Sequence, residues 1–221
     1  MHMSLQRYAP LTGVAFLPLV IAMVLVPGET PGDTDSTATV FRYWAGHDTE
    51  QIVASIIGAY AAVLLVWFAA SLRTTIAKVE EHGRLATLTL AGAVVAATGL
   101  LIMLAVQFAA ANTVGDVPAV TTQTLSLLAA DLWFVLGAGF GLMLVAAGLA
   151  AVRYGWLPRW AAWATLVLGV LTASPVIWPA MLAVPFWIAG LGIAVFRMEA
   201  AAVEAPRAAA APAPPDAQPA L

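Results

Sequence analysis

The sequence predicts an all-α integral membrane protein, a bundle of six transmembrane helices with a short amphipathic helix in an outer loop. Of the 221 residues, 62% are hydrophobic and only 10% are charged, whereas soluble domains have about 25% charged residues. The apolar residues gather in runs of about 20, the length that an α-helix needs to cross a bilayer. Lysine and arginine are concentrated in alternate loops, as in membrane proteins of fixed orientation.

The predicted crossings follow one another through most of the chain. They cover residues of about 11–26, 52–72, 85–111, 125–152, 161–174 and 180–196. The first run could also be a cleaved signal peptide, but the segment after it lacks a small-residue cleavage site, which favours a retained anchor helix. The last two runs are at the short end of the spanning range, so a re-entrant hairpin is their alternative.

Two segments outside the crossings have a predicted structure of their own. In the loop before the second crossing, Asp35 or Ser36 can cap a short helix over residues 37–45. Its apolar side chains, including Val40 and Trp44, fall on one side. This helix either lies on the membrane surface or packs as a cover on the bundle. At the other end of the chain, residues 198–221 are rich in alanine and proline, and we expect a disordered cytoplasmic tail.

The orientation follows from the cations. With six crossings, one side of the membrane receives Arg7, Arg73, Lys78, Arg84, Arg153, Arg159, Arg197 and Arg207. Only Arg42 lies on the opposite side. Because the cytoplasmic loops of membrane proteins carry the excess of lysine and arginine, we expect both termini in the cytoplasm.

Tryptophans are enriched at membrane interfaces, and most of those in this chain fit such a belt. We expect Trp156, Trp160 and Trp163 at the cytoplasmic level, and Trp44, Trp133 and Trp178 at the outer level.

Small residues form helical stripes on two of the crossings. The third crossing has Gly92 and Gly99, and the fourth has Gly137, Gly141 and Gly148. Small residues allow the close backbone approach that holds helices together in lipid. We therefore expect each stripe to face the other or a near neighbour. A homo-oligomer built on the same pattern is the alternative to packing within one chain.

A few polar residues near the outer boundary form a candidate site, the outer-rim cluster of Asp131, Gln107, Arg42 and Asn112. Counting about 20 residues back from Arg153 places Asp131 at the outer boundary of the fourth crossing. Its carboxylate could pair with Arg42, contact a ligand or ion, or simply face water. Gln107 and Asn112 would line a small polar mouth or cap helix ends.

The sequence contains no recognised catalytic or cofactor-binding pattern. The absence of cysteine excludes disulfides and thiolate sites. The run of His47, Asp48 and Glu50 matches no known metal-ligand spacing, and its acidic residues suit the first turn of a helix. Motifs such as HExxH and GxSxG do not occur. We therefore expect no enzyme activity, no cofactor and no metal, and the basic loops are too sparse for nucleic acid.

Two segments resemble a known family. They are LVAAGLAAVRYGWLPRWAAW around the turn after the fourth crossing, and VFRYWAGHDTEQIVASIIGAYAAVLLVWFAASLR in the outer loop and second crossing. They resemble uncharacterised small multi-pass membrane proteins of high-GC Gram-positive bacteria, over most of residues 10–197. The resemblance implies the topology and a bacterial plasma-membrane location. It implies no activity and assigns no functional residue.

Two functions follow as expectations. The near absence of polar groups inside the crossings favours a non-enzymatic scaffold, accessory or sensor protein in the lipid bilayer, with a membrane-protein partner or a second copy of itself. The alternative is a small-solute transporter or channel with a polar outer mouth near Asp131. Transporters usually contain internal repeats and interrupted helices, and no convincing repeat occurs here.

Overall fold

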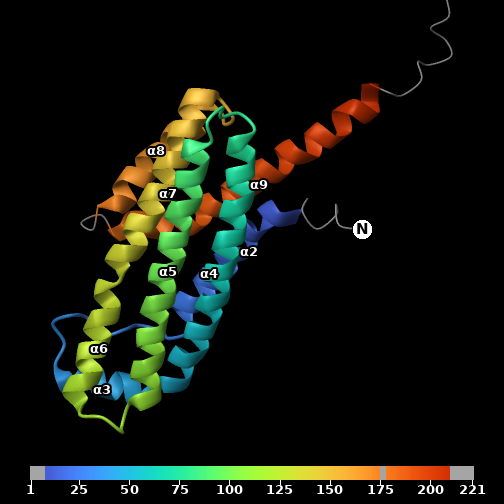
Figure 1. Ribbon diagram of the computed structural model, residues 1–221. Helices are drawn as coiled ribbons and strands as arrows, with labels where there is room; N and C mark the ends of the chain where they lie inside the picture. Colours follow the sequence, from blue (N-terminus) through green and yellow to red (C-terminus); the bar gives the residue numbers. More distant parts are fainter. Residues whose placement is uncertain (1–7, 175–177, 210–221) are drawn as a thin grey trace, which may run out of the picture.

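The computed structural model describes residues 8–174 and 178–209, and in these ranges the chain forms helices and no strand (Figure 1). The elements are η1 (Ala9–Leu11), α2 (Thr12–Leu25), α3 (Thr37–Gly46), α4 (Asp48–Ala77), α5 (Arg84–Thr113), α6 (Ala119–Asp131), α7 (Trp133–Tyr154), α8 (Arg159–Ala173) and α9 (Trp178–Ala209). The prediction of an all-helical fold is confirmed.

Four stretches are long and apolar enough to cross a membrane. They are Asp48–Ala77, Arg84–Thr113, Ala119–Tyr154 and Pro179–Ala202. A helix of 30 residues, as in α4 and α5, is about 45 Å long and exceeds the roughly 30 Å hydrocarbon core of a bilayer. The other apolar helices, Ala9–Leu25 and Arg159–Ala173, are shorter. The chain is therefore a helical protein with four evident membrane-spanning candidates.

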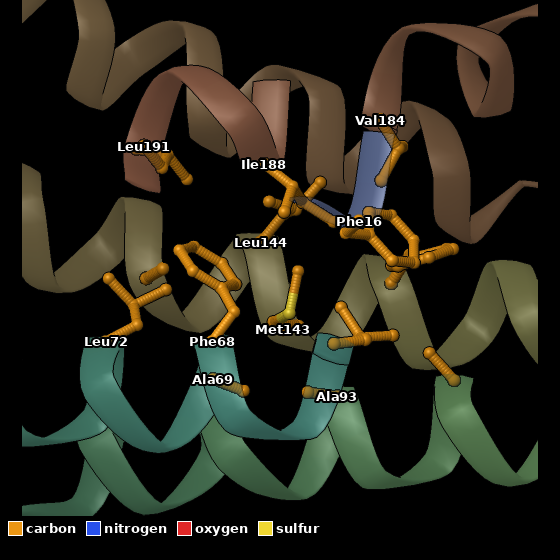
Figure 2. Close-up of a cluster of buried hydrophobic side chains, with 14 of the residues drawn as sticks. Phe16, Phe68, Ala69, Leu72, Ala93, Met143, Leu144, Val184, Ile188 and Leu191 are labelled. Atoms are coloured by element: carbon orange, nitrogen blue, oxygen red, sulfur yellow. The ribbon is translucent and has the colours of Figure 1, made fainter. Parts of the chain in front are cut away.

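The long helices lie side by side and alternate in direction (Figure 1). Helix α5 packs between α4 and α7, α8 packs on α7, and α2 packs between α4 and α9. Four of these helices meet in the main core, where Figure 2 shows Phe16 of α2, Phe68 of α4, Met143 of α7 and Ile188 of α9 pointing toward one another. All four side chains are at most 1% exposed. The core therefore holds elements from both ends of the sequence together.

Glycine and alanine bring α5 and α7 into backbone contact. A Cβ atom added at Gly92 would overlap the backbone of Met143, and one added at Gly139 would overlap the backbone of Ala96. At Gly99 it would lie 3.0 Å from the Leu136 nitrogen. The stripe on α5 thus faces α7, as small residues at membrane-helix contacts usually do.

The glycine stripe on α7 faces a different neighbour, α8. A Cβ atom at Gly141 would lie 2.6 Å from the Ala173 side chain, and one at Gly148 would lie 2.6 Å from the Leu166 nitrogen. At Gly137 it would lie 2.8 Å from the carbonyl oxygen of Thr172, also in α8. The two stripes therefore do not face each other. Helix α7 is packed closely on two sides, and Gly139, which is in neither predicted stripe, belongs to the α5 side.

The fourth predicted crossing begins earlier than expected and is interrupted. The expected polar link over residues 112–124 is already helical from Ala119, and α6 and α7 meet at a break around Leu132. Threonine has only modest helix propensity, but here α6 is held by contacts with α3 and α5. Tertiary packing therefore extends helix into a segment whose composition predicts a loop.

The C-terminal helix also runs further than expected. Helix α9 continues to Ala209 and projects beyond the bundle (Figure 1), whereas the disordered tail was predicted from residue 198. Alanine is the best helix former, and extending an existing helix needs no new nucleus. The Lys78 ammonium also lies 3.6 Å from the Glu199 carboxylate. Residues 210–221, the remainder of the expected tail, lie outside the described residues.

Substituting Gly139 by alanine should destabilise the bundle. The new methyl group would overlap the backbone of Ala96, and overpacking of this kind costs about 1–3 kcal/mol. The matched control is Gly190→Ala, where no atom beyond its own stretch of helix lies within 4 Å of the added carbon. Thermal unfolding of both variants in detergent checks this. If Gly139→Ala unfolds at the temperature of Gly190→Ala, the close α5–α7 contact is wrong.

Candidate functional site

The side chains that could recognise or react with something gather at the two ends of the bundle. We call one end the cap: α3, α6, the start of α4 and the end of α5 (Figure 1). The other is the cation end, which contains the α4–α5 and α7–α8 turns (Figure 1). The cap has its own apolar cluster, in which Val40 and Trp44 of α3 pack on Ala110 and Ala111 of α5.

Helix α3 covers the bundle. Its N-terminal cap is Ser36, whose hydroxyl oxygen accepts a hydrogen bond from the Thr39 amide at 3.2 Å, a typical capping contact. Val40 and Trp44 are each 3% exposed, because protein atoms enclose them. This helix was expected either to lie on the membrane surface or to pack as a cover on the bundle. The side chains of Val40 and Trp44 pack on the bundle.

A hydrogen-bond network centred on Tyr43 ties three segments of the cap together. The Tyr43 hydroxyl donates to the Pro27 carbonyl oxygen at 2.9 Å, and the Gln51 side-chain amide donates to that hydroxyl at 2.9 Å. Gln51 is only 2% exposed. The His47 ring stacks on Tyr43, with ring centroids 4.6 Å apart. The loop after α2, helix α3 and the start of α4 are therefore fixed relative to one another.

The surroundings of Tyr43 change its acidity. Burial raises the pKa of the Tyr43 hydroxyl above its usual value of 10.0, because the phenolate would lose its hydration. The hydrogen bond from Gln51 works in the opposite direction, and the negative charge of Glu50 adds to the rise. The hydroxyl therefore stays neutral over the ordinary pH range.

A second connection joins α3 to α6. The Thr37 hydroxyl donates to the side-chain oxygen of Gln123, and the Gln123 amide donates to the Asp35 carbonyl oxygen at 3.4 Å. Two buried polar atoms in the cap, the Trp44 indole nitrogen and the Thr122 hydroxyl, have no hydrogen-bond partner.

The structure does not join the four residues of the outer-rim cluster. Asp131 is exposed at the end of α6, Arg42 is exposed on α3, Asn112 is exposed near the end of α5, and Gln107 is half-buried in α5. The Arg42 guanidinium donates to the Ala38 carbonyl oxygen at 3.3 Å. Within residues 8–174 and 178–209, no hydrogen bond or ion pair links any two of the four.

The acidic residues before the second crossing serve the start of α4. Asp48 and Glu50 lie in its first turn, where negative charge is favoured. The Asp48 carboxylate accepts from the Thr49 amide at 2.7 Å. No group of three or more potential metal ligands occurs in the part of the chain that the structure describes.

In the part of the chain that the structure describes, the interior of the bundle offers no row of free polar groups. Six buried hydroxyls donate to a carbonyl oxygen of their own helix, those of Ser55, Ser71, Thr75, Thr89, Thr165 and Thr172. One of them has a second role, because the Trp187 indole donates to the Thr165 oxygen at 3.0 Å. The hydroxyls therefore contribute little polarity to the space between helices.

A groove of about 290 Å³ lies between α2, α7 and α9. Its walls are apolar and include Phe16, Met23, Phe140, Met181 and Pro185. Trp133 is one of its lining residues, but Asp131 is not. The groove could hold a hydrocarbon chain, and its lining would not hold water.

At the cation end, Glu80 is used to complete the fold. It is 6% exposed, and its two carboxylate oxygens accept from the Leu85 amide at 2.8 Å and the Ala86 amide at 2.9 Å. The residue at the N-terminal cap position is Gly83, which has no side chain to offer and has φ of 63°. Glu80 therefore supplies the cap of α5 from a distance in the sequence.

The tryptophans divide between interface and interior. Trp160, Trp163 and Trp133 are exposed, as an interfacial belt requires. Trp156 and Trp44 are instead buried in the two hydrophobic clusters, so neither ring is exposed as an interfacial belt requires; Trp156 comes from the α7–α8 turn and Trp44 from α3. The side chain of Trp178 lies outside the described residues.

Comparison with known proteins finds no matching family model, no matching curated protein and no matching solved structure. The resemblance to multi-pass membrane proteins of Gram-positive bacteria stays an expectation.

Replacing Tyr43 by phenylalanine should weaken the cap. Gln51 would keep a buried amide without its acceptor, which costs about 1–3 kcal/mol. The raised pKa of Tyr43 means that its contribution is complete below pH 10.0 and is lost as the pH rises toward the folded-state value. Chemical denaturation of the wild type across alkaline pH should therefore show a decline that Tyr43→Phe lacks. The control is Tyr154→Phe, at an exposed tyrosine; an equal effect there would refute the assignment.

Replacing Glu80 by alanine should destabilise the cation end. Two amide groups at the start of α5 would lose their acceptor, and losing a cap costs about 0.5–2 kcal/mol. The neighbouring exposed glutamate gives a matched control, Glu81→Ala, which should leave stability unchanged. Hydrogen exchange at Leu85 and Ala86 reports the local effect. Unchanged exchange in Glu80→Ala would show that the cap has no role.

Proposed function

We propose that this chain is a multi-pass plasma-membrane protein with six membrane-crossing helices and both termini in the cytoplasm. We further propose that it acts as a non-enzymatic scaffold, accessory or sensor protein. In this proposal α2 and α8 complete the six crossings, although they are only about 21 and 22 Å long. Short helices are accommodated by local thinning of the bilayer and by packing against longer neighbours.

One observation carries the functional part of the proposal: the buried hydroxyls of α4, α5 and α8 donate to carbonyl oxygens of their own helices. A transport path needs polar groups or water at the middle of the bundle. Around the centre the side chains are instead Phe16, Phe68, Met143 and Ile188. The groove beside them is also apolar. A bundle built in this way supports binding and assembly better than solute passage.

The arrangement of charge supports the orientation. Arg73, Arg84, Arg153 and Arg159 all belong to the cation end, whereas the exposed carboxylates Asp33, Asp48, Glu50 and Asp116 belong to the cap or the loop leading into it. Cations are retained in the cytoplasm during membrane insertion. The cap would then be the outer surface, available to a partner or a signal.

Flux measurement separates the proposal from its transporter alternative. Purified protein in liposomes should pass ions and small solutes no faster than protein-free liposomes, because the side chains at the centre of the bundle are apolar among the described residues. The comparison includes Asp131→Asn. Flux in the wild type that this substitution abolishes would replace the proposal with the transporter.

The same preparation tests the accessory role. Gentle extraction from the native membrane should recover the chain with another membrane protein, or with a second copy, in a fixed ratio. Recovery as a monomer without a partner would contradict the assignment as a scaffold or accessory subunit.

A further inference from the structure

The contacts between α5 and α7 fix which residues are level with each other along the bundle. Gly92 lies against Met143, and Gly139 lies against Ala96. The two helices are antiparallel, so moving one residue toward the start of α5 corresponds to moving one residue toward the end of α7. Arg84 is thus level with Ala151, only two residues, or about 3 Å, from Arg153.

The contacts between α7 and α8 place a third cation beside them. Gly148 lies against Leu166, and Gly141 lies against Ala173. Continued toward the α7–α8 turn, this register brings Arg159 level with Gly155, about 3 Å beyond Arg153. Three arginines from three neighbouring helices therefore lie within about 6 Å of one another along the bundle axis. All three are exposed.

Two exposed tryptophans mark the same level. Trp160 and Trp163 on α8 are 70% and 53% exposed. Trp160 is held in place, because it packs edge-on against Trp187 with ring centroids 6.2 Å apart. Trp187 is in turn hydrogen-bonded to Thr165. Amphipathic rings of this kind prefer the headgroup region of a bilayer.

The nearby carboxylates leave the arginines free. Glu80 has both oxygens on backbone amides of α5, and Glu199 pairs with Lys78 at 3.6 Å. Glu81 is exposed on the α4–α5 turn. Across the described residues, no ion pair joins Arg84, Arg153 or Arg159 to a carboxylate. These guanidinium groups therefore retain their capacity to bind phosphate.

We propose that Arg84, Arg153 and Arg159, which lie at the same level of the bundle as Trp160 and Trp163, form a surface around the bundle that binds the phosphates of anionic phospholipids. The tryptophans place the hydrocarbon boundary at the level of the arginines, which suits a lipid headgroup and not a soluble anion. The surface rests on the proposed membrane insertion. It adds to that proposal a lipid class and the residues that select it.

Titration of phosphatidylglycerol into the detergent-solubilised full chain tests the surface, with occupancy read by native mass spectrometry and phosphatidylcholine as the reference lipid. The wild type should prefer phosphatidylglycerol. Each basic residue near an anionic surface strengthens binding about fivefold, so Arg153→Gln with Arg159→Gln should weaken it about 25-fold. The corresponding lysine substitutions should retain most of the preference, since they keep the charge.

The matched control is Arg42→Gln, which removes an exposed arginine from the cap and should leave lipid preference unchanged. Equal binding of the two lipids by the wild type would overturn the proposal. So would a double glutamine variant that binds like the wild type, or an equal loss in Arg42→Gln. Displacement of the lipid by inorganic phosphate at a similar concentration would show a site for soluble anions instead.

Orientation is measured separately in intact cells, using the absence of native cysteine. Glu81→Cys should react with an impermeant maleimide only after permeabilisation, and Asp116→Cys should react before it. Reversed labelling would refute the proposed orientation and leave the lipid titration valid, because that measurement does not depend on sidedness. Correct labelling without lipid preference would refute the lipid surface alone.

Discussion

Direct backbone contact between α5 and α7 is the constraint on which the rest of the bundle depends. Lipid is as apolar as the side chains, so helices in a bilayer gain little by hiding hydrophobic surface from it. Gly92, Ala96 and Gly139 replace that missing driving force with close packing between α5 and α7. Helix α7 makes a second contact of the same kind with α8. It therefore fixes the positions of both α5 and α8.

With this packing, polar side chains either bond to the backbone of their own helix or lie at the ends of the bundle. Helices in such close contact have no room between them for water, so hydroxyls such as those of Thr89 and Thr172 turn back to their own carbonyl groups. Larger polar side chains lie at the ends. At the cap they make neutral hydrogen bonds that join loops and helices, as Gln51 does with Tyr43. At the cation end the arginine side chains remain charged and exposed, whereas Glu80 is buried.

Hydrophobic run length was enough to predict the helical class and most helix positions, because a span must satisfy its own backbone hydrogen bonds in lipid. It could not predict Glu80 as the cap of α5, since the carboxylate reaches the helix start over a turn. Nor could it predict that Tyr43 and Gln51 meet, because that contact depends on the angle between α3 and α4. Asp131 was singled out for its charge within an apolar run. The break at Leu132 instead ends α6 at this residue and leaves it exposed.

The difference between the two ends follows from how each is held. The cap is stabilised by short contacts among neutral groups, which depend little on the surrounding charge and hold α3 rigidly over the bundle. At the cation end the fold needs only Glu80 and the small-residue contacts below it, so Arg84, Arg153 and Arg159 are not required for packing. Three uncommitted cations on one level are unfavourable to each other unless something neutralises them. With the proposed membrane insertion, a bilayer surface that contains anionic lipid would supply that neutralisation at the level of Trp160 and Trp163.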